Sequence, residues 1–189
     1  MNAIADAVAG LFIEGGAGAV SIVNTAQKLE VSRATLYRTV SSKEDLVGIL
    51  FERTTNTQSA LLAAVADADL PSRDRLIRLI ELQVEAAVHM RGYMPVFFGG
   101  AGLPVDVFER WHSWSREYER TWMRCVEQAI AEGVVVGSDA LTTTRLLLGM
   151  CMWVSRWYRP DEDIDTAVIA RSAVRLLLPR EGGEESGAS

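Results

Sequence analysis

The sequence has few of the residues that build metal and catalytic centres. It contains only two cysteines, Cys125 and Cys151, and two histidines, His89 and His112, and none of them has the paired spacing of a zinc site. The motif Gly-x-Ser-x-Gly of one hydrolase class is also absent. We therefore expect no metal ion and no cofactor, and a small helical enzyme is the least supported function.

The sequence also lacks a long apolar run. No uninterrupted stretch reaches the roughly twenty residues that a membrane-spanning helix needs. The N-terminus has no basic segment, and its apolar residues alternate with Asp6 and Glu14, so we predict no signal peptide. The protein is expected to be cytoplasmic, where a disulfide is not expected.

The chain has no overall excess of positive charge, because its net charge is −6. An acidic total argues against a nucleic-acid partner, but the local distribution decides the question. From Lys28 to Lys43, four basic residues stand against one acidic residue. Attraction to phosphates depends on such a patch, within a screening length of about 8 Å at physiological salt. The charge pattern is compatible with DNA binding.

The stretch from 21 to 43 is predicted to form two short helices joined by a tight turn. Ser21 can cap the first helix and Ser32 the second, and the three residues 29–31 between them suit a helix-turn-helix. Any small helical domain contains caps and short helices. Periodicity alone therefore favours DNA binding no more than it favours a helical domain without that function. The residues predicted to face the core are Ile22, Ala26, Leu29, Val31, Leu36 and Val40.

The opposite face of the second short helix would present hydrogen-bond donors to DNA. Arginine binds guanine edges or phosphates, and threonine and tyrosine hydroxyls bind phosphates. Ser41 and Glu44 follow a capping-box pattern for a further helix, and Lys43 in its first turn suits a phosphate brought to the helix start. The predicted DNA-binding residues are Arg33, Ala34, Thr35, Tyr37, Arg38, Thr39 and Lys43.

One block of residues raises the odds of DNA binding. It consists of Leu11-Phe12, Gly15-Gly16, Ser21, Ala26, Val31-Ser32, Thr35-Leu36-Tyr37 and Ser42-Lys43-Glu44-Asp45-Leu46. This block resembles the TetR family of bacterial transcriptional repressors. The resemblance implies an all-α fold, with a three-helix helix-turn-helix head over 1–45 and a helical-bundle body over 46–180 that holds a ligand cavity and a dimer interface. The acidic, glycine-rich residues 181–189 are predicted to be disordered.

Several positions depart from the family pattern. Glu30 stands where the family typically has glycine, and a left-handed turn there would cost roughly 1 kcal/mol more than at glycine. Thr39 replaces an aromatic residue and Val40 a phenylalanine. The chain begins almost within its first predicted helix, without the basic arm that often precedes it; either this member does without the arm or the start codon is placed too late. These departures support an alternative, a TetR-like ligand-binding protein whose head no longer binds DNA.

The remaining helices of the head and the body follow from apolar spacing and from glycine and proline breaks. Residues 2–14 form a helix that Gly15-Gly16 ends, a connecting helix runs from 43 to about 56 or beyond, and further helices are predicted over 73–90, 105–132, 138–158 and 164–178. The helix over 138–158 is apolar nearly all round, so we expect a second subunit to cover one side of it. The last two helices would then form the isologous interface of a homodimer.

Residues 105–132 carry three tryptophans and a tyrosine along one stripe. Core packing is the better explanation for most of them, but such a wall also suits an apolar ligand cavity. The short segments 117–119 and 157–161 are similar to TetR-type regulators of fatty-acid and steroid catabolism, several of which respond to acyl-CoA thioesters. That resemblance implies arginines such as Arg156 or Arg159 at the cavity mouth, although a solvated helix end explains them better.

The predicted function is a TetR-type repressor that a small apolar or amphipathic effector, with an acyl-CoA as one candidate, releases from a palindromic operator in double-stranded DNA. The candidate ligand-binding residues are Met90, Met94, Phe97, Phe98, Trp111, Trp114, Tyr118, Met150, Trp153 and Trp157.

Overall fold

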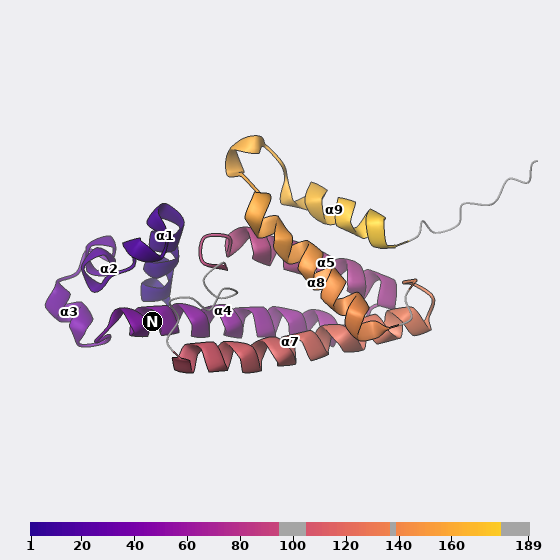
Figure 1. Cartoon of the computed structure of the whole chain (residues 1–189), viewed down its shortest axis with the longest axis horizontal. Helices are drawn as coiled ribbons and strands as arrows, with labels where there is room; N and C mark the ends of the chain where they lie inside the picture. Colours follow the sequence, from indigo (N-terminus) through magenta and orange to yellow (C-terminus); the bar gives the residue numbers. More distant parts are fainter. Residues whose placement is uncertain (95–104, 137–138, 179–189) are drawn as a thin grey trace, which may run out of the picture.

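The computed structural model describes residues 1–94, 105–136 and 139–178. Over these residues the chain is all-α, as predicted, without a strand (Figure 1). None of the described helices is long and apolar enough to cross a bilayer. In chain order the elements are α1 (Asn2–Ala19), α2 (Ile22–Lys28), α3 (Arg33–Tyr37), α4 (Lys43–Ala66), α5 (Ser72–His89), α7 (Val105–Ala131), α8 (Ala140–Trp157), the short 3-10 helix η1 (Pro160–Glu162) and α9 (Thr166–Leu177).

The helix α4 connects the two ends of the molecule (Figure 1). It packs against α1, α5 and α7, and its first turns contact both α1 and the start of α7. We call α1 to α3 the head, and α5 and α7 to α9 the body. In the body, α8 packs on α5 and α7, and α9 packs on α5. The predicted body helices lie within two residues of their predicted ends, whereas α4 continues to Ala66 instead of about residue 56.

Serine side chains begin the three helices that follow α1. Ser21 Oγ accepts a hydrogen bond from the amide of Asn24 at 3.1 Å, and Ser32 Oγ accepts one from Thr35 at 3.0 Å, as predicted. The capping box of α4 was predicted one residue too early: it is formed by Ser42 and Asp45. Ser41 has a different role, because its hydroxyl and amide both donate to Asp45 Oδ2 and hold the pKa of that carboxyl below its ordinary value.

Two turns in the head require unusual backbone conformations. Gly15 and Gly16 have non-helical conformations, with φ of 66° at Gly16, so the first helical segment ends there, as predicted, and a short second segment continues α1 to Ala19. Glu30 adopts the predicted left-handed conformation, with φ of 55°. The prediction that Val31 faces the core is wrong, because this turn leaves it 39% exposed, outside the periodicity of either helix.

The described residues form two hydrophobic cores. The first contains the apolar residues of the head, the first part of α4, and Met90, Tyr93, Val107 and Trp111 of the body. The second lies among α5, α7, α8 and α9 around Trp122, whose side chain is fully buried, and Leu62 of α4 also belongs to it. The helix α4 is therefore part of both cores.

A second contact joins head and body where α5 ends. The rings of Phe12 on α1 and Tyr93 pack with centroids 6.2 Å apart. At Gly92, an added Cβ would lie 2.6 Å from Ile13 Cγ1 and 3.0 Å from its Cα, so only glycine fits without displacement. The turn at 90–94 therefore lies directly against α1.

The strained turn at Glu30 leads to a stability prediction. Glu30→Gly should raise the free energy of unfolding by about 1 kcal/mol, because glycine adopts positive φ without a steric cost. Urea denaturation at pH 7 measures the change.

Glu30→Ala is the matched control, since alanine removes the same carboxylate but keeps the Cβ. An equal gain in both variants would show that charge, and not backbone conformation, limits stability at this position.

Candidate DNA-binding surface and ligand cavity

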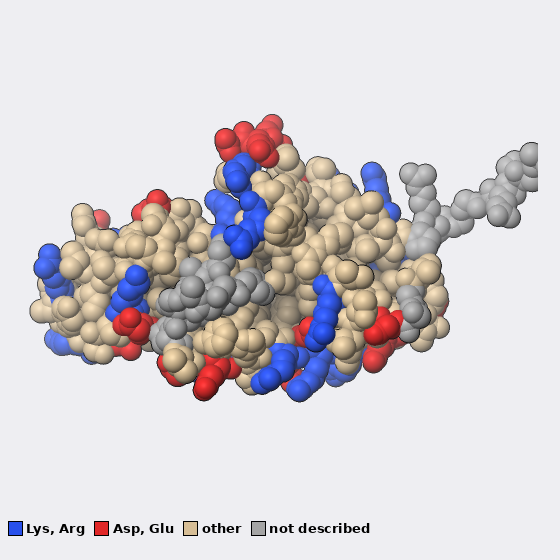
Figure 2. All heavy atoms as spheres, in the orientation of Figure 1, with Lys and Arg blue, Asp and Glu red and all other residues tan. Residues whose placement is uncertain are grey.

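The head exposes all seven residues that the sequence predicts to contact DNA. They lie on α3, on the two residues after it, and at the start of α4, while Leu36 and Val40 are buried beneath them. Basic side chains are visible at this tip of the head (Figure 2). The surface therefore offers arginine and tyrosine donors on one short helix.

Two of the seven residues already have partners within the head. Lys43 Nζ donates to the carbonyl oxygen of Ala17 at 2.6 Å, at the end of α1. The Thr35 hydroxyl hydrogen-bonds with the Ser32 hydroxyl at 2.8 Å. These contacts could not be read from the sequence, because they depend on how α1 and the N-cap of α3 are placed.

A cavity of about 370 Å³ lies between α4, α5, α7 and α8. Its aromatic wall is continuous: the rings of Trp111 and Trp114 are 5.0 Å apart, and those of Trp114 and Tyr118 are 4.9 Å apart. Five of the predicted ligand-binding residues line this cavity: Met90, Met94, Trp111, Trp114 and Tyr118. Phe97 and Phe98 lie outside the described residues.

Neutral hydrogen bonds hold the cavity wall in place. The Tyr118 hydroxyl donates to Gln83 Oε1 at 2.9 Å, and Trp114 Nε1 donates to Ser59 Oγ at 2.9 Å, which ties α7 to α5 and α4. Burial raises the pKa of Tyr118 to about 12, so the phenol is protonated at neutral pH. Gln83 was not predicted as a site residue, although a glutamine between Ile80 and Val84 on an apolar helix face is a visible signal.

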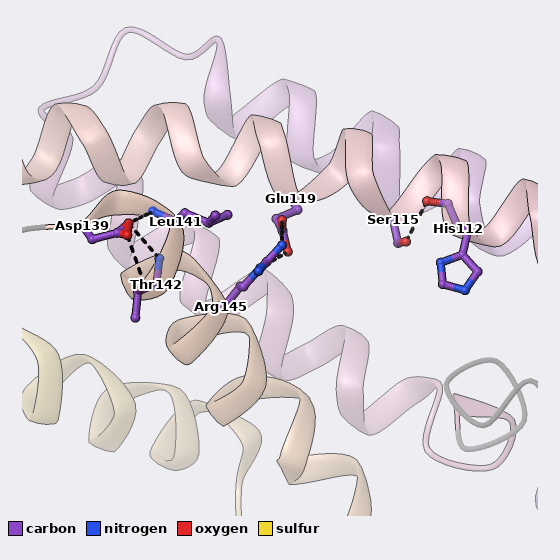
Figure 3. Close-up of polar contacts among 7 residues, drawn as sticks. All are labelled: His112, Ser115, Glu119, Asp139, Leu141, Thr142 and Arg145. Carbon is purple, nitrogen blue, oxygen red and sulfur yellow. Dashed lines mark hydrogen bonds and ion pairs between the residues drawn. The ribbon is translucent and has the colours of Figure 1, made fainter.

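Charged side chains lie at the edge of the cavity. Arg145 of α8 donates to Glu119 of α7 through Nε and Nη2, at 3.1 and 3.0 Å (Figure 3). Both residues line the cavity together with Arg116. The arginines predicted for the mouth do not line it. The cavity-lining positions of α8 end at Met152, so Arg156 lies beyond them, and Arg159 donates to the carbonyls of Arg156 and Tyr158.

The other three predicted ligand residues do not line this cavity. Met150, Trp153 and Trp157 lie along an adjoining groove of about 770 Å³, formed mainly by α8 and α9, which shares Arg145 and Gly149 with the cavity. The reason is helical geometry: α8 is apolar on two faces, and these residues lie on the face that points away from the aromatic wall. Trp153 is 64% exposed and Leu176 is 80% exposed, so this second face is an apolar surface on the single chain.

Two family models match the chain. The model described as bacterial regulatory proteins, tetR family, matches residues 4–48, and a tetracyclin repressor-like C-terminal domain matches residues 69–180. The chain belongs to the TetR family. The sequence resemblance is thereby confirmed, and the matched family consists of regulators of transcription.

Solved structures of TetR-type regulators share the fold. A TetR/AcrR regulator from Thermobifida fusca is 21% identical, with a TM-score of 0.76, and covers 92% of this chain and 93% of its own. The regulator KstR2 of Mycobacterium tuberculosis is 20% identical, with a TM-score of 0.77 and 94% of both chains covered. AibR, in complex with isovaleryl coenzyme A and operator DNA, is 20% identical, with a TM-score of 0.80, and the match covers 94% of this chain and 97% of the AibR chain. A comparison with curated protein sequences gives no significant match.

The buried hydrogen bond of Tyr118 leads to a pH-dependent prediction. Tyr118→Phe should lower the free energy of unfolding at pH 7 by about 1–3 kcal/mol, because Gln83 Oε1 loses its donor. The fold favours the protonated phenol, so its contribution is complete below the unfolded pKa of about 10 and is lost as pH rises toward 12. Urea denaturation of both proteins from pH 7 to pH 11.5 measures this.

The wild type should therefore lose more stability above pH 10 than the variant does. Parallel pH profiles for the two proteins would contradict the assignment of that loss to Tyr118.

Proposed function

We propose that this TetR-family member is a cytoplasmic homodimeric repressor, which leaves a palindromic operator when a small apolar or amphipathic effector fills the aromatic cavity. The observation that carries the proposal is the position of α4, which begins six residues after α3 ends and later forms part of the cavity wall. A ligand in the cavity would therefore contact the helix that supports the DNA-binding surface. We place the DNA-binding domain at 1–45 and the ligand-binding and dimerisation domain, which includes most of α4, at 46–180.

The ligand would act by its different affinity for two arrangements of the dimer. If it binds the arrangement whose heads do not match successive major grooves, it lowers DNA affinity by that difference, typically about 1–3 kcal/mol. No contact with DNA is required of the effector.

An acyl-CoA is our candidate effector. The cavity volume and its apolar aromatic wall suit an acyl group, and Arg116 at the edge suits a phosphate. AibR, which has a similar fold, is in complex with isovaleryl coenzyme A. The acyl-CoA proposal thus rests on the similarity of fold and on the charge at the cavity edge.

The exposed apolar face of α8 and α9 supports the dimer. Burying it against the same face of a second chain would form an isologous contact and remove from water the side chains that are exposed on the single chain. These side chains include Leu146, Trp153, Val168 and Leu176.

A second candidate function is ligand binding without DNA binding. Two features of the head favour it. Glu30 places a carboxylate and a strained backbone in the turn before α3, and Lys43 donates to the Ala17 carbonyl oxygen instead of being left for a DNA phosphate. Direct DNA binding separates the two candidates.

Substitutions on the head test the DNA-binding assignment. Tyr37→Ala should weaken binding to operator and scrambled DNA alike, because a phosphate contact carries no sequence information, whereas Arg38→Ala should cost about 1–3 kcal/mol and also relax base preference. Fluorescence anisotropy with labelled DNA from the upstream region of the gene, titrated with scrambled competitor, measures both effects.

Arg78→Ala in α5, an exposed arginine outside the head, is the control and should leave binding unchanged. Equal loss on operator and scrambled DNA for Arg38→Ala would remove its base-reading role, and absence of specific binding in the wild type at this DNA would favour the second candidate.

A charge on the apolar face tests the dimer. Leu176→Glu should convert the protein to a monomer at micromolar concentration, because the carboxylate would lose its hydration in the interface. Sedimentation velocity measures the mass. Val105→Glu, at an exposed apolar position of α7, is the matched control and should remain dimeric. A monomeric wild type, or a dimeric Leu176→Glu variant, would exclude this interface.

A further inference from the structure

Gln58 is a buried polar residue without a complete set of partners. It lies on α4, lines the aromatic cavity, and is only 9% exposed. Its Oε1 has no hydrogen-bond partner among the described residues. Buried amide oxygens are normally paired, and leaving one unpaired costs free energy. The oxygen is itself enclosed, so a ligand in the cavity would reach it once the amide turns toward the cavity.

The neighbouring polar groups of the wall are already engaged. Tyr118 donates to Gln83, and Trp114 donates to Ser59. At the edge of the cavity, Arg145 is paired with Glu119. Gln58 is thus the wall residue whose acceptor remains to be satisfied, and its terminal torsion has a broad preference that lets the amide turn toward a bound molecule.

The charge of the lining restricts what can bind beside Gln58. The groups around the aromatic wall are neutral, including the protonated Tyr118, and the ionised side chains of the lining are Arg116, Glu119 and Arg145. A charge placed against the tryptophan rings would lose its hydration without a counter-charge. An ionised ligand group would therefore lie by these three side chains, and the part within the wall would be neutral.

We propose that the cavity binds a ligand whose enclosed part is apolar and neutral and carries one hydrogen-bond donor, an amide N–H or a hydroxyl, which donates to Gln58 Oε1. This inference rests on the effector cavity proposed above and adds the class of its ligand. Because Gln58 belongs to α4 while the rings belong to α7, such a ligand links the helix that supports the head to the aromatic wall.

Two matched probes test the donor. N-(2-phenylethyl)butanamide and 2-phenylethyl butanoate have the same apolar groups and the same carbonyl, but only the amide has an N–H. Titration calorimetry without DNA gives Kd for each probe with the wild type, with Gln58→Met, and with the control Gln27→Met, which changes an exposed glutamine of α2.

The amide should bind the wild type and the control about tenfold more tightly than the ester. Gln58→Met should bind both probes with similar affinity, since it keeps the volume of the side chain but replaces the amide oxygen with a thioether, which is only a weak acceptor. Equal affinities in the wild type, a preference that persists in Gln58→Met, or no binding of either probe would overturn the proposal. The wild-type comparison is decisive even where the variant does not fold.

A separate measurement keeps this result distinct from the proposed function. The amide is added to the protein bound to operator DNA, and release is followed by anisotropy. Preferential binding of the amide in calorimetry without release of DNA would leave the role of Gln58 intact and count against effector control by this cavity.

Discussion

The structure depends on the burial of one helix in two hydrophobic cores. Near its start, α4 places Leu46 and Leu50 in the core shared with the head, and near its end it places Leu62 in the core of the body. A helix is stiff over such a length because each turn is hydrogen-bonded to the next. The head therefore has no core that is separate from α4. Exposed ion pairs of α4, such as Arg110 with Glu52, accompany this packing but contribute little compared with it.

Local features of the fold were predictable because they depend on neighbouring residues. Serine caps and the ends of the body helices follow from short-range rules about hydrogen bonding and apolar spacing, whereas the left-handed turn at Glu30 was implied by the family resemblance. The error at Val31 has the same origin: the residue was assigned to a helical face although it lies in the turn. The capping box shifted by one residue because two adjacent serines offered alternative starts for α4.

The cavity was only partly predictable, because it depends on how the helices face one another. The aromatic stripe of α7 indicated a wall, and Met90 and Met94 line the same cavity. A nearly uniform apolar helix gives no sign of which face turns inward, so the sequence could not separate Met150, Trp153 and Trp157, which line the groove, from the residues that line the cavity. The sequence did not reveal Gln58 and Arg145 as cavity residues, because their places in the lining depend on how α4, α7 and α8 pack together. The roles of all these residues in binding remain proposals.

The fit of Gly92 against Ile13 has a mechanical consequence. Among the described residues, the head is held both along α4, where the start of α7 joins the same core, and at the turn that follows α5, and Met90 and Met94 in that turn also line the cavity. A rigid element that is attached at one place can swing in many directions. With two attachments its easiest movement is rotation about the line that joins them, so the geometry of the fold restricts how a change in the cavity can reorient the head.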